Sequence, residues 1–327
     1  MNYKMMGRFI AQILLLEAIF MIPASFISLY CGEYRSVFAF LGTMALLVLI
    51  SGVLWFFCKA AKSNFYATDG MVCVALSWLI LSLAGSLPFL FSGAIPRFID
   101  ALFEIVSGFT TTGASILPAV EGLPKGILYW RSFSHWVGGM GVLVFLLAIV
   151  PSTDQGKGFT MHLLRAESPG PSVGKLVPKM RKTAAILYFL YIILTIADFC
   201  FLLLGGMPAF EAVCNAFGTA GTGGFGVRND SFASYSPYLQ NVTTVFMFLF
   251  GVNFSCYYLL MLRQWGAVFK DEELRAYFGI ALGSALLITW NVRGLYGSWG
   301  ETFRHAAFQV SSIMTTTGFA TTDFDLW

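Results

Sequence analysis

Long apolar runs alternate with short polar loops along the whole chain. Seven of these runs are long enough to cross the hydrocarbon core of a bilayer, for which a helix needs about 20 apolar residues. We therefore predict membrane-spanning helices over residues 9–30, 38–58, 71–91, 127–150, 183–204, 238–262 and 274–292. The first run has no convincing small-residue cleavage site, so we interpret it as a retained helix and not as a signal peptide.

Shorter amphipathic runs that break into Thr and Gly lie between the later spans. The first, Phe103–Leu117, reads FEIVSGFTTTGASIL, and the sequence FQVSSIMTTTGFATTDF from Phe308 repeats its Phe and TTTG at the same offsets. A looser copy, FEAVCNAFGTAGTGGFG, occupies Phe210–Gly226 and is three residues longer. An internal repeat of this kind determines the fold prediction. Each unit consists of a span, a short pore helix, a Thr-Gly loop and a second span.

This repeat predicts an all-α integral membrane protein. We expect an N-terminal two-span hairpin over residues 1–60 and a first pore unit over 61–155. A second unit, with a preceding cytoplasmic loop, covers 156–265. An incomplete third unit covers 266–327 and stops before its second span.

Composition supports a membrane protein and excludes several other classes. Hydrophobic residues make up 57% of the chain and charged residues 11%, whereas a soluble domain carries about 25% charged residues. The six cysteines are scattered without a C-x-x-C pair, so neither a disulfide framework nor a zinc site is indicated. We expect no organic cofactor, no nucleic-acid partner and no enzymatic activity.

The distribution of basic residues predicts the orientation. The N-terminus and the loops 59–70, 151–182 and 263–275 hold 13 of the 20 Lys and Arg residues. With seven spans, these four segments fall on one side, which the positive-inside rule makes cytoplasmic. All three Thr-Gly loops then face outside. The 151–182 loop is either a solvated linker, a docking surface or only a positive anchor.

The repeated loops have the properties of a cation filter. Irregular backbone at membrane depth is tolerated where it lines a cavity or is buried in protein, and the carbonyl end of a pore helix favours a cation there. Free backbone carbonyls can replace the hydration shell of K⁺. The predicted filter residues are Thr111, Thr112, Gly113, Gly221, Thr222, Gly223, Thr316, Thr317 and Gly318. Because glycine adopts conformations closed to other residues, we expect Gly113, Gly223 and Gly318 to tolerate a side chain least.

Other polar residues have two interpretations each. Glu104 and Glu211 share a position near the start of their pore helices, so they are first structural and second cation-attracting. Asp198 lies inside a span, which makes it a candidate functional residue; a buried hydrogen bond is the alternative. Asp323 and Asp325 follow the third loop and are candidates for attracting cations from outside.

Several motifs resemble the TrkH-type potassium uptake proteins of bacteria, in the superfamily that includes KtrB and the plant HKT transporters. They are SGFTTTGAS, RSFSHWVGGMGVLVFLLAIVP, LLRAESPGPSVGKLVPKMRKTA, GTAGTGGFGVRNDSF, GVNFSCYYLL and TTTGFATTDFDLW. The leading hairpin favours TrkH over KtrB, which lacks it. The glycines of HWVGGMG, at 138, 139 and 141, are expected to allow close helix packing, and His135 beside them is not expected to bind a metal.

The resemblance implies four units around a pseudo-fourfold pore in the bacterial inner membrane. It also implies a homodimer with one pore in each subunit and a cytoplasmic, nucleotide-binding TrkA-like regulator. Relative to that plan, the chain is expected to be a fragment without the fourth unit. We therefore keep three hypotheses: K⁺ uptake, channel-like or coupled to Na⁺ or H⁺; a non-conducting truncated subunit; and a membrane enzyme using His135 and Asp198.

Overall fold

The computed structural model describes residues 3–58, 67–139, 141 and 180–327. Three helices lie over the residues of the expected N-terminal hairpin: α1 (Tyr3–Phe20), α2 (Ile22–Tyr30) and α3 (Tyr34–Phe57). The first repeat unit contains α4 (Ala67–Ser92), α5 (Phe98–Phe109) and α6 (Lys125–Gly139). Within the described residues the regular structure is helical, in agreement with the predicted fold class.

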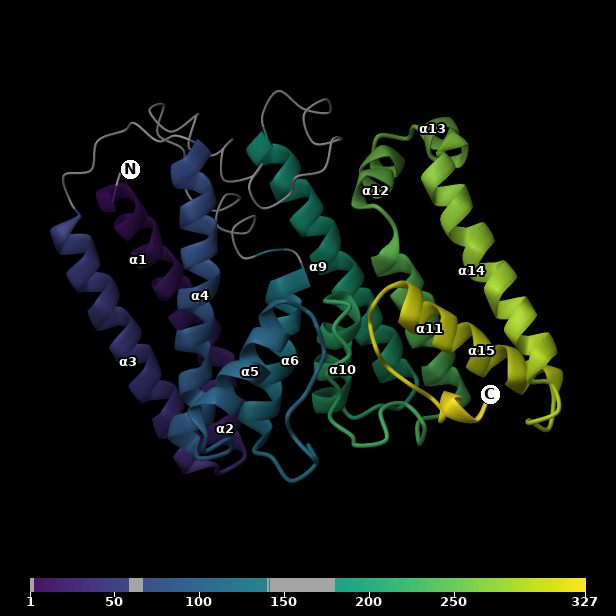
Figure 1. Cartoon of the computed structure of the whole chain (residues 1–327), viewed down its shortest axis with the longest axis horizontal. Helices are drawn as coiled ribbons and strands as arrows, with labels where there is room; N and C mark the ends of the chain where they lie inside the picture. The colour runs from purple at the N-terminus through teal and green to yellow at the C-terminus, as the bar shows by residue number, and fades with distance from the viewer. Residues whose placement is uncertain (1–2, 59–66, 140, 142–179) are drawn as a thin grey trace.

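The second and third units follow the same plan. The second contains α9 (Met180–Leu204), α10 (Ala209–Ala220), α11 (Pro237–Gly251), α12 (Phe254–Met261) and α13 (Trp265–Lys270). The third contains α14 (Glu272–Asn291), α15 (Trp299–Met314) and the 3-10 turn η2 (Phe324–Leu326). Figure 1 shows the units side by side, with the N-terminus, α12 and α13 at one end of the bundle and α2 at the opposite end.

Four of the predicted spans are recovered as segments long and apolar enough to cross a membrane: Tyr3–Tyr30, Tyr34–Phe57, Asp69–Ser92 and Ala185–Leu204. The span predicted over 127–150 begins as α6, and its part beyond Gly139, apart from residue 141, lies outside the described residues. The span predicted over 274–292 is the continuous helix α14, which is less apolar than the four segments above. Acidic residues explain its clear start, because the Asp271 side chain accepts a hydrogen bond from Leu274 N at 2.8 Å.

The span predicted over 238–262 is broken into two helices. Helices α11 and α12 meet at an angle of 87°. Val252 is extended between them, and the Asn253 side chain starts α12 by accepting a hydrogen bond from Ser255 N at 3.0 Å. Two tyrosine hydroxyls then satisfy carbonyls at the end of α11: Tyr257 donates to Leu249 O at 2.6 Å and Tyr277 to Phe248 O at 3.1 Å. The bend is therefore stabilised by side chains rather than left with open carbonyls.

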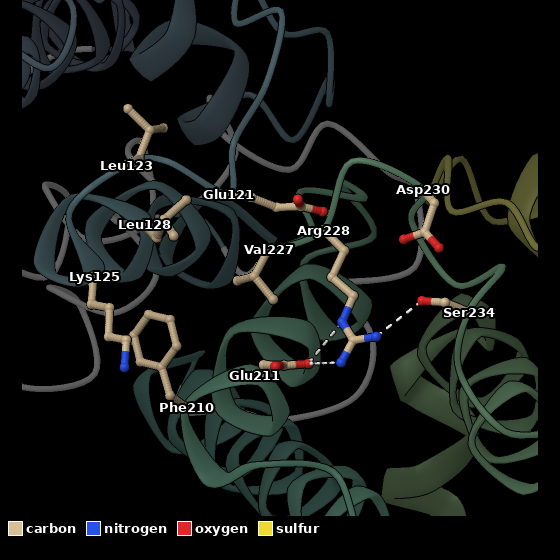
Figure 2. A pocket seen from close by; sticks show the side chains of 10 residues that line it. All are labelled: Glu121, Leu123, Lys125, Leu128, Phe210, Glu211, Val227, Arg228, Asp230 and Ser234. Carbon is tan, nitrogen blue, oxygen red and sulfur yellow. Dashed lines mark hydrogen bonds and ion pairs between the residues drawn. The ribbon is translucent and has the colours of Figure 1, made fainter.

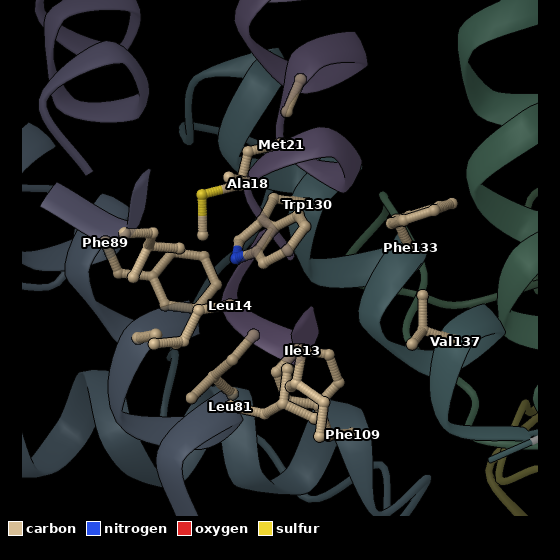
Figure 3. Packing of buried hydrophobic residues seen from close by; sticks show 14 of the residues in the cluster. Ile13, Leu14, Ala18, Met21, Leu81, Phe89, Phe109, Trp130, Phe133 and Val137 are labelled. Atoms are coloured by element: carbon tan, nitrogen blue, oxygen red, sulfur yellow. The ribbon is translucent and has the colours of Figure 1, made fainter. Parts of the chain in front are cut away.

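The N-terminal hairpin shares one hydrophobic core with the first unit. Figure 3 shows Ile13 and Leu14 of α1 packed with Phe89 of α4 and with Trp130 of α6. Trp130 is fully buried and its indole donates to Gly85 O at 2.9 Å. The hairpin is therefore packed into the first unit rather than attached as a separate body.

A charged side chain also joins the hairpin to the first unit. Glu33, in the turn before α3, accepts hydrogen bonds from the backbone nitrogens of Lys125 at 2.7 Å and Gly126 at 3.2 Å. These are the first two nitrogens of α6, which have no partner within their own helix. The hairpin thus caps the helix that follows the first Thr-Gly loop.

Candidate functional site

The three short helices α5, α10 and α15 end in the same backbone fold. The residue after each helix cap has a positive φ: Thr111 (54°), Thr222 (50°) and Thr316 (60°). A glycine two residues later also has a positive φ: Gly113 (77°), Gly224 (75°) and Gly318 (87°). A branched residue with positive φ is a real outlier that costs about 1–3 kcal/mol. Its recurrence at equivalent positions indicates a functional constraint on these loops.

This fold corrects the register of the second loop. The sequence comparison matched Gly223 to Gly113 and Gly318, but the left-handed glycine of this loop is Gly224. Counted from the helix caps, Glu104 corresponds to Asn215, whereas Glu211 lies in the first turn of α10. The shared FE opening therefore misled the alignment, and Glu104 lies in the middle of α5 rather than near its start.

The loops form a row in which each contacts the next. A Cβ atom added to Gly113 would collide with the carbonyl oxygen of Gly223, and one added to Gly224 would collide with that of Thr317. A Cβ at Gly318 would meet nothing within 4 Å. The row is thus tightly packed from the first loop to the third, and it is open beyond Gly318. Gly113 and Gly224 cannot accept a side chain without moving a neighbouring loop.

The loop carbonyls are free to bind a ligand. Among the described residues, no hydrogen bond reaches the carbonyl oxygens of Thr111, Thr112 or Gly113, nor those of their counterparts in the other loops. The backbone nitrogens instead turn back to the helix: Thr112 N donates to Ser107 O at 2.9 Å and Thr317 N to Ser312 O at 2.8 Å. This arrangement satisfies the nitrogens and leaves the oxygens available, as cation coordination requires.

A buried ion pair supports the first two loops. Glu104 is fully buried, and Arg131 Nε lies 2.5 Å from its Oε1. The same carboxylate accepts hydrogen bonds from Ser115 Oγ at 3.0 Å and from Ile116 N at 3.0 Å, just beyond Gly113. Arg131 also donates to Gly226 O at 3.1 Å, and its guanidinium lies 3.5 Å from the centre of the Phe225 ring, in the second loop. Neither side chain of the pair is exposed to solvent, which favours the structural interpretation of Glu104 over the cation-attracting one.

A cavity of about 490 Å³ lies between the loop before α6 and the start of α10. Figure 2 shows Arg228 at its wall, directed to Glu211 and Ser234. Tyr235 donates to Glu211 at 2.6 Å. Burial, and then this hydrogen bond, raises the pKa of the Tyr235 phenol, so it remains a donor. Glu211 is therefore engaged in a local network at the wall of this cavity.

The remaining predicted polar residues lie in different surroundings. Asp198 on α9 is fully buried and its oxygens have no hydrogen-bond partner among the described residues. The nearby Thr219 hydroxyl donates instead to Asn215 O. Asp323 and Asp325 are exposed after the third loop, where the Asp323 side chain accepts from Asp325 N at 3.1 Å. Asp323 thus has a local capping role as well as its predicted outer position.

The glycines near the end of α6 allow close packing, as predicted. A Cβ at Gly138 would collide with Phe109 O, and one at Gly139 would lie 2.7 Å from Gly221 Cα. Helix α6 therefore contacts both the first and the second loop. The structure also shows a contact between α6 and the second loop that the sequence did not predict. The His135 ring lies against Gly223.

Fold and site together define a class: a multi-pass helical membrane protein with repeated re-entrant helices and Thr-Gly loops. A family model described as TrkH, cation transport protein, matches residues 36–289. The chain belongs to the TrkH family.

Known proteins of this family are similar over most of the chain. The Trk system potassium uptake protein TrkH of Salmonella typhimurium is 36% identical over 296 residues, which are 88% of this chain and 60% of that protein. TrkG of Escherichia coli is 33% identical over 95% of this chain and 64% of its own length. The crystal structure of the potassium transporter TrkH from Vibrio parahaemolyticus has a TM-score of 0.84 and 31% identity, covering 100% of this chain and 67% of that one. The chain thus spans about 60% of the length of the Salmonella relative.

Proposed function

We propose that the chain provides a K⁺ uptake pathway in which backbone carbonyls of the three Thr-Gly loops coordinate the ion. The observation that carries this proposal is the repeated loop fold, with oxygens free of hydrogen bonds and glycines packed against the next loop's carbonyl. Carbonyl ligands without carboxylates suit an alkali cation better than Ca²⁺ or Mg²⁺. The predicted filter residues keep this role except Gly221, which is the cap of α10 and corresponds to Thr110 and Thr315. Gly224 is added in the second loop.

We propose that a fourth loop, which the resemblance implies, lies on the open side of the row, beyond Gly318. We further propose the bacterial inner membrane as the location, with the N-terminus cytoplasmic and the loops outside. A homodimer and a TrkA-like regulator are the proposed partners. The 151–182 loop, for which a docking surface is one of the interpretations, lies outside the described residues except for 180–182, which begin α9. The proposed K⁺ uptake is supported by two relatives, TrkH of Salmonella typhimurium and TrkG of Escherichia coli, which are both called potassium uptake proteins.

The test is K⁺ binding to the purified protein, followed by transport. A ligand that binds only the folded state stabilises it by about 2.7 kcal/mol at a concentration of 100 Kd. We expect KCl and RbCl to raise the midpoint of thermal unfolding in detergent above the value in choline chloride, and NaCl to do so less. Equal midpoints in all four salts would contradict the proposal.

Gly113→Ala and Gly122→Ala form a matched pair for this assay. Gly113 has a positive φ and faces Gly223 O, whereas Gly122 is exposed and a Cβ there would meet nothing within 4 Å. We expect Gly113→Ala to abolish the difference between KCl and NaCl and to lower the K⁺/Na⁺ uptake ratio of cells expressing the complete open reading frame. Gly122→Ala should change neither quantity.

A further inference from the structure

The second Thr-Gly loop differs from the other two in its side chains. In the first loop, the hydroxyls of Thr110 and Thr112 lie 2.8 Å apart, and in the third loop those of Thr315 and Thr317 lie 2.7 Å apart. Each pair ties the helix cap to the residue before the left-handed glycine. The second loop has glycines at both positions, 221 and 223, so it cannot form this bond. Something else must hold its backbone.

His135 of α6 occupies the corresponding place. A Cβ added to Gly223 would collide with His135 Nδ1 and would lie 2.5 Å from Cε1, so the imidazole fills the space of the missing side chain. The ring is stacked on Phe225, with centroids 3.9 Å apart and planes inclined by 21°. Its Nδ1 accepts a hydrogen bond from Phe225 N at 3.4 Å. One side chain from the first unit therefore contacts the second loop on both sides of Gly224.

The tautomer follows from these contacts. Because Nδ1 accepts from a backbone nitrogen, the proton of a neutral ring is on Nε2. That nitrogen is buried without a hydrogen bond among the described residues, and the nearby backbone group is that of Ser107 at the end of α5. Ser107 O already accepts from Thr112 N in the first loop. The imidazole thus lies between the first pore helix and the second loop.

The residue of α11 that is equivalent to His135 of α6 is Met247, which has no polar ring. Gly139 of α6 faces Gly221 at the second helix cap, and Gly251 of α11 faces Thr315 at the third, so these glycines are equivalent. Four residues before each lie His135 and Met247, both fully buried. Met247 belongs to the same buried cluster as Phe319 of the third loop. That loop has its own threonine pair, whereas the loop next to His135 has none. The polar ring is therefore present where the hydroxyl pair is absent.

We propose that His135 is a positioning residue for ion selectivity, replacing the threonine pair of the other loops and fixing the Gly223 carbonyl beside Gly113. The proposal rests on the proposed K⁺ pathway. A lost or displaced Gly223 oxygen would change the coordination shell, so selectivity would fall before overall folding does.

Two substitutions separate the hydrogen bond from the packing. His135→Asn keeps an acceptor close to the position of Nδ1, whereas His135→Leu fills space without an acceptor. An unpaired Phe225 nitrogen at a buried site costs enough to change an equilibrium by about tenfold or more. We expect His135→Leu to lower the K⁺/Na⁺ uptake ratio about tenfold, and His135→Asn to retain most of it. Met247→Leu is the matched control and should leave the ratio unchanged.

A compensating pair tests the packing. Gly223→Ala alone should abolish selective uptake, because the new methyl group meets the imidazole. Combining it with His135→Ala removes the obstacle and should restore uptake to above the level of Gly223→Ala. Equal K⁺/Na⁺ ratios for wild type and both His135→Leu and His135→Asn, or failure of the double variant to improve on Gly223→Ala, would overturn the inference. Absence of K⁺ selectivity in the wild type would instead refute the proposed pathway itself.

Discussion

The Glu104–Arg131 ion pair provides a quantitative test of what holds the first two loops together. Both side chains are almost completely removed from solvent, with 0% and 5% exposure, and Arg131 is the link to Gly226 and Phe225 of the next loop. Arg131→Met keeps an apolar stem of similar length but removes the charge. It leaves the Glu104 carboxylate buried with only Ser115 and Ile116 as partners.

The expected cost follows from the burial of the pair. Removing one member of a buried ion pair destabilises a protein by about 3–5 kcal/mol, because the other charge remains in a medium of low polarity. Replacing both members is often close to neutral. The double variant Glu104→Gln/Arg131→Met should therefore be more stable than Arg131→Met alone, by about 2 kcal/mol or more.

Unfolding in mixed detergent micelles, followed by tryptophan fluorescence, measures these differences. Arg228→Met is the matched control, since the Glu211–Arg228 pair at 2.9 Å is 23% and 33% exposed. Such a partly solvated pair contributes about 0–1 kcal/mol. If the double variant loses as much stability as the sum of the two single variants, the two charges do not act as a pair and the reasoning is refuted.

Three further predictions follow from other contacts. Glu33→Ala removes the cap of α6 and should lower stability by about 1–2 kcal/mol, measured by the same unfolding titration; no loss would mean that water caps the helix equally well. Gly139→Ala should destabilise the protein, whereas Gly279→Ala, at a helical site with open space, should be neutral or stabilising by up to about 1 kcal/mol; equal effects would contradict the close approach to the second loop. In a background without native cysteines, Gly122→Cys should react with an impermeant thiol reagent from outside and Lys270→Cys only from the cytoplasm, and the reverse pattern would invert the proposed orientation.

Apolar segment length and the repeat together predicted the architecture. Runs of about 20 apolar residues can satisfy their backbone in a bilayer only as helices, so most spans were evident before any packing was known. The repeated TTTG predicted the first and third loops, because their threonines and glycine lie at the same offset from the helix end. The motifs also predicted the TrkH family, which the family match confirmed.

Tertiary structure decided what depends on contacts between distant residues. The second loop's register was not readable, because FE at Phe210 resembles FE at Phe103 while the helix end lies at Gly221. The bend after Gly251 depends on tyrosine hydroxyls of α12 and α14, which donate hydrogen bonds to the carbonyl oxygens freed at the end of α11. The same holds for His135, since 88 residues separate it from Gly223 along the chain and only packing brings its ring to the space that a threonine fills in the other loops.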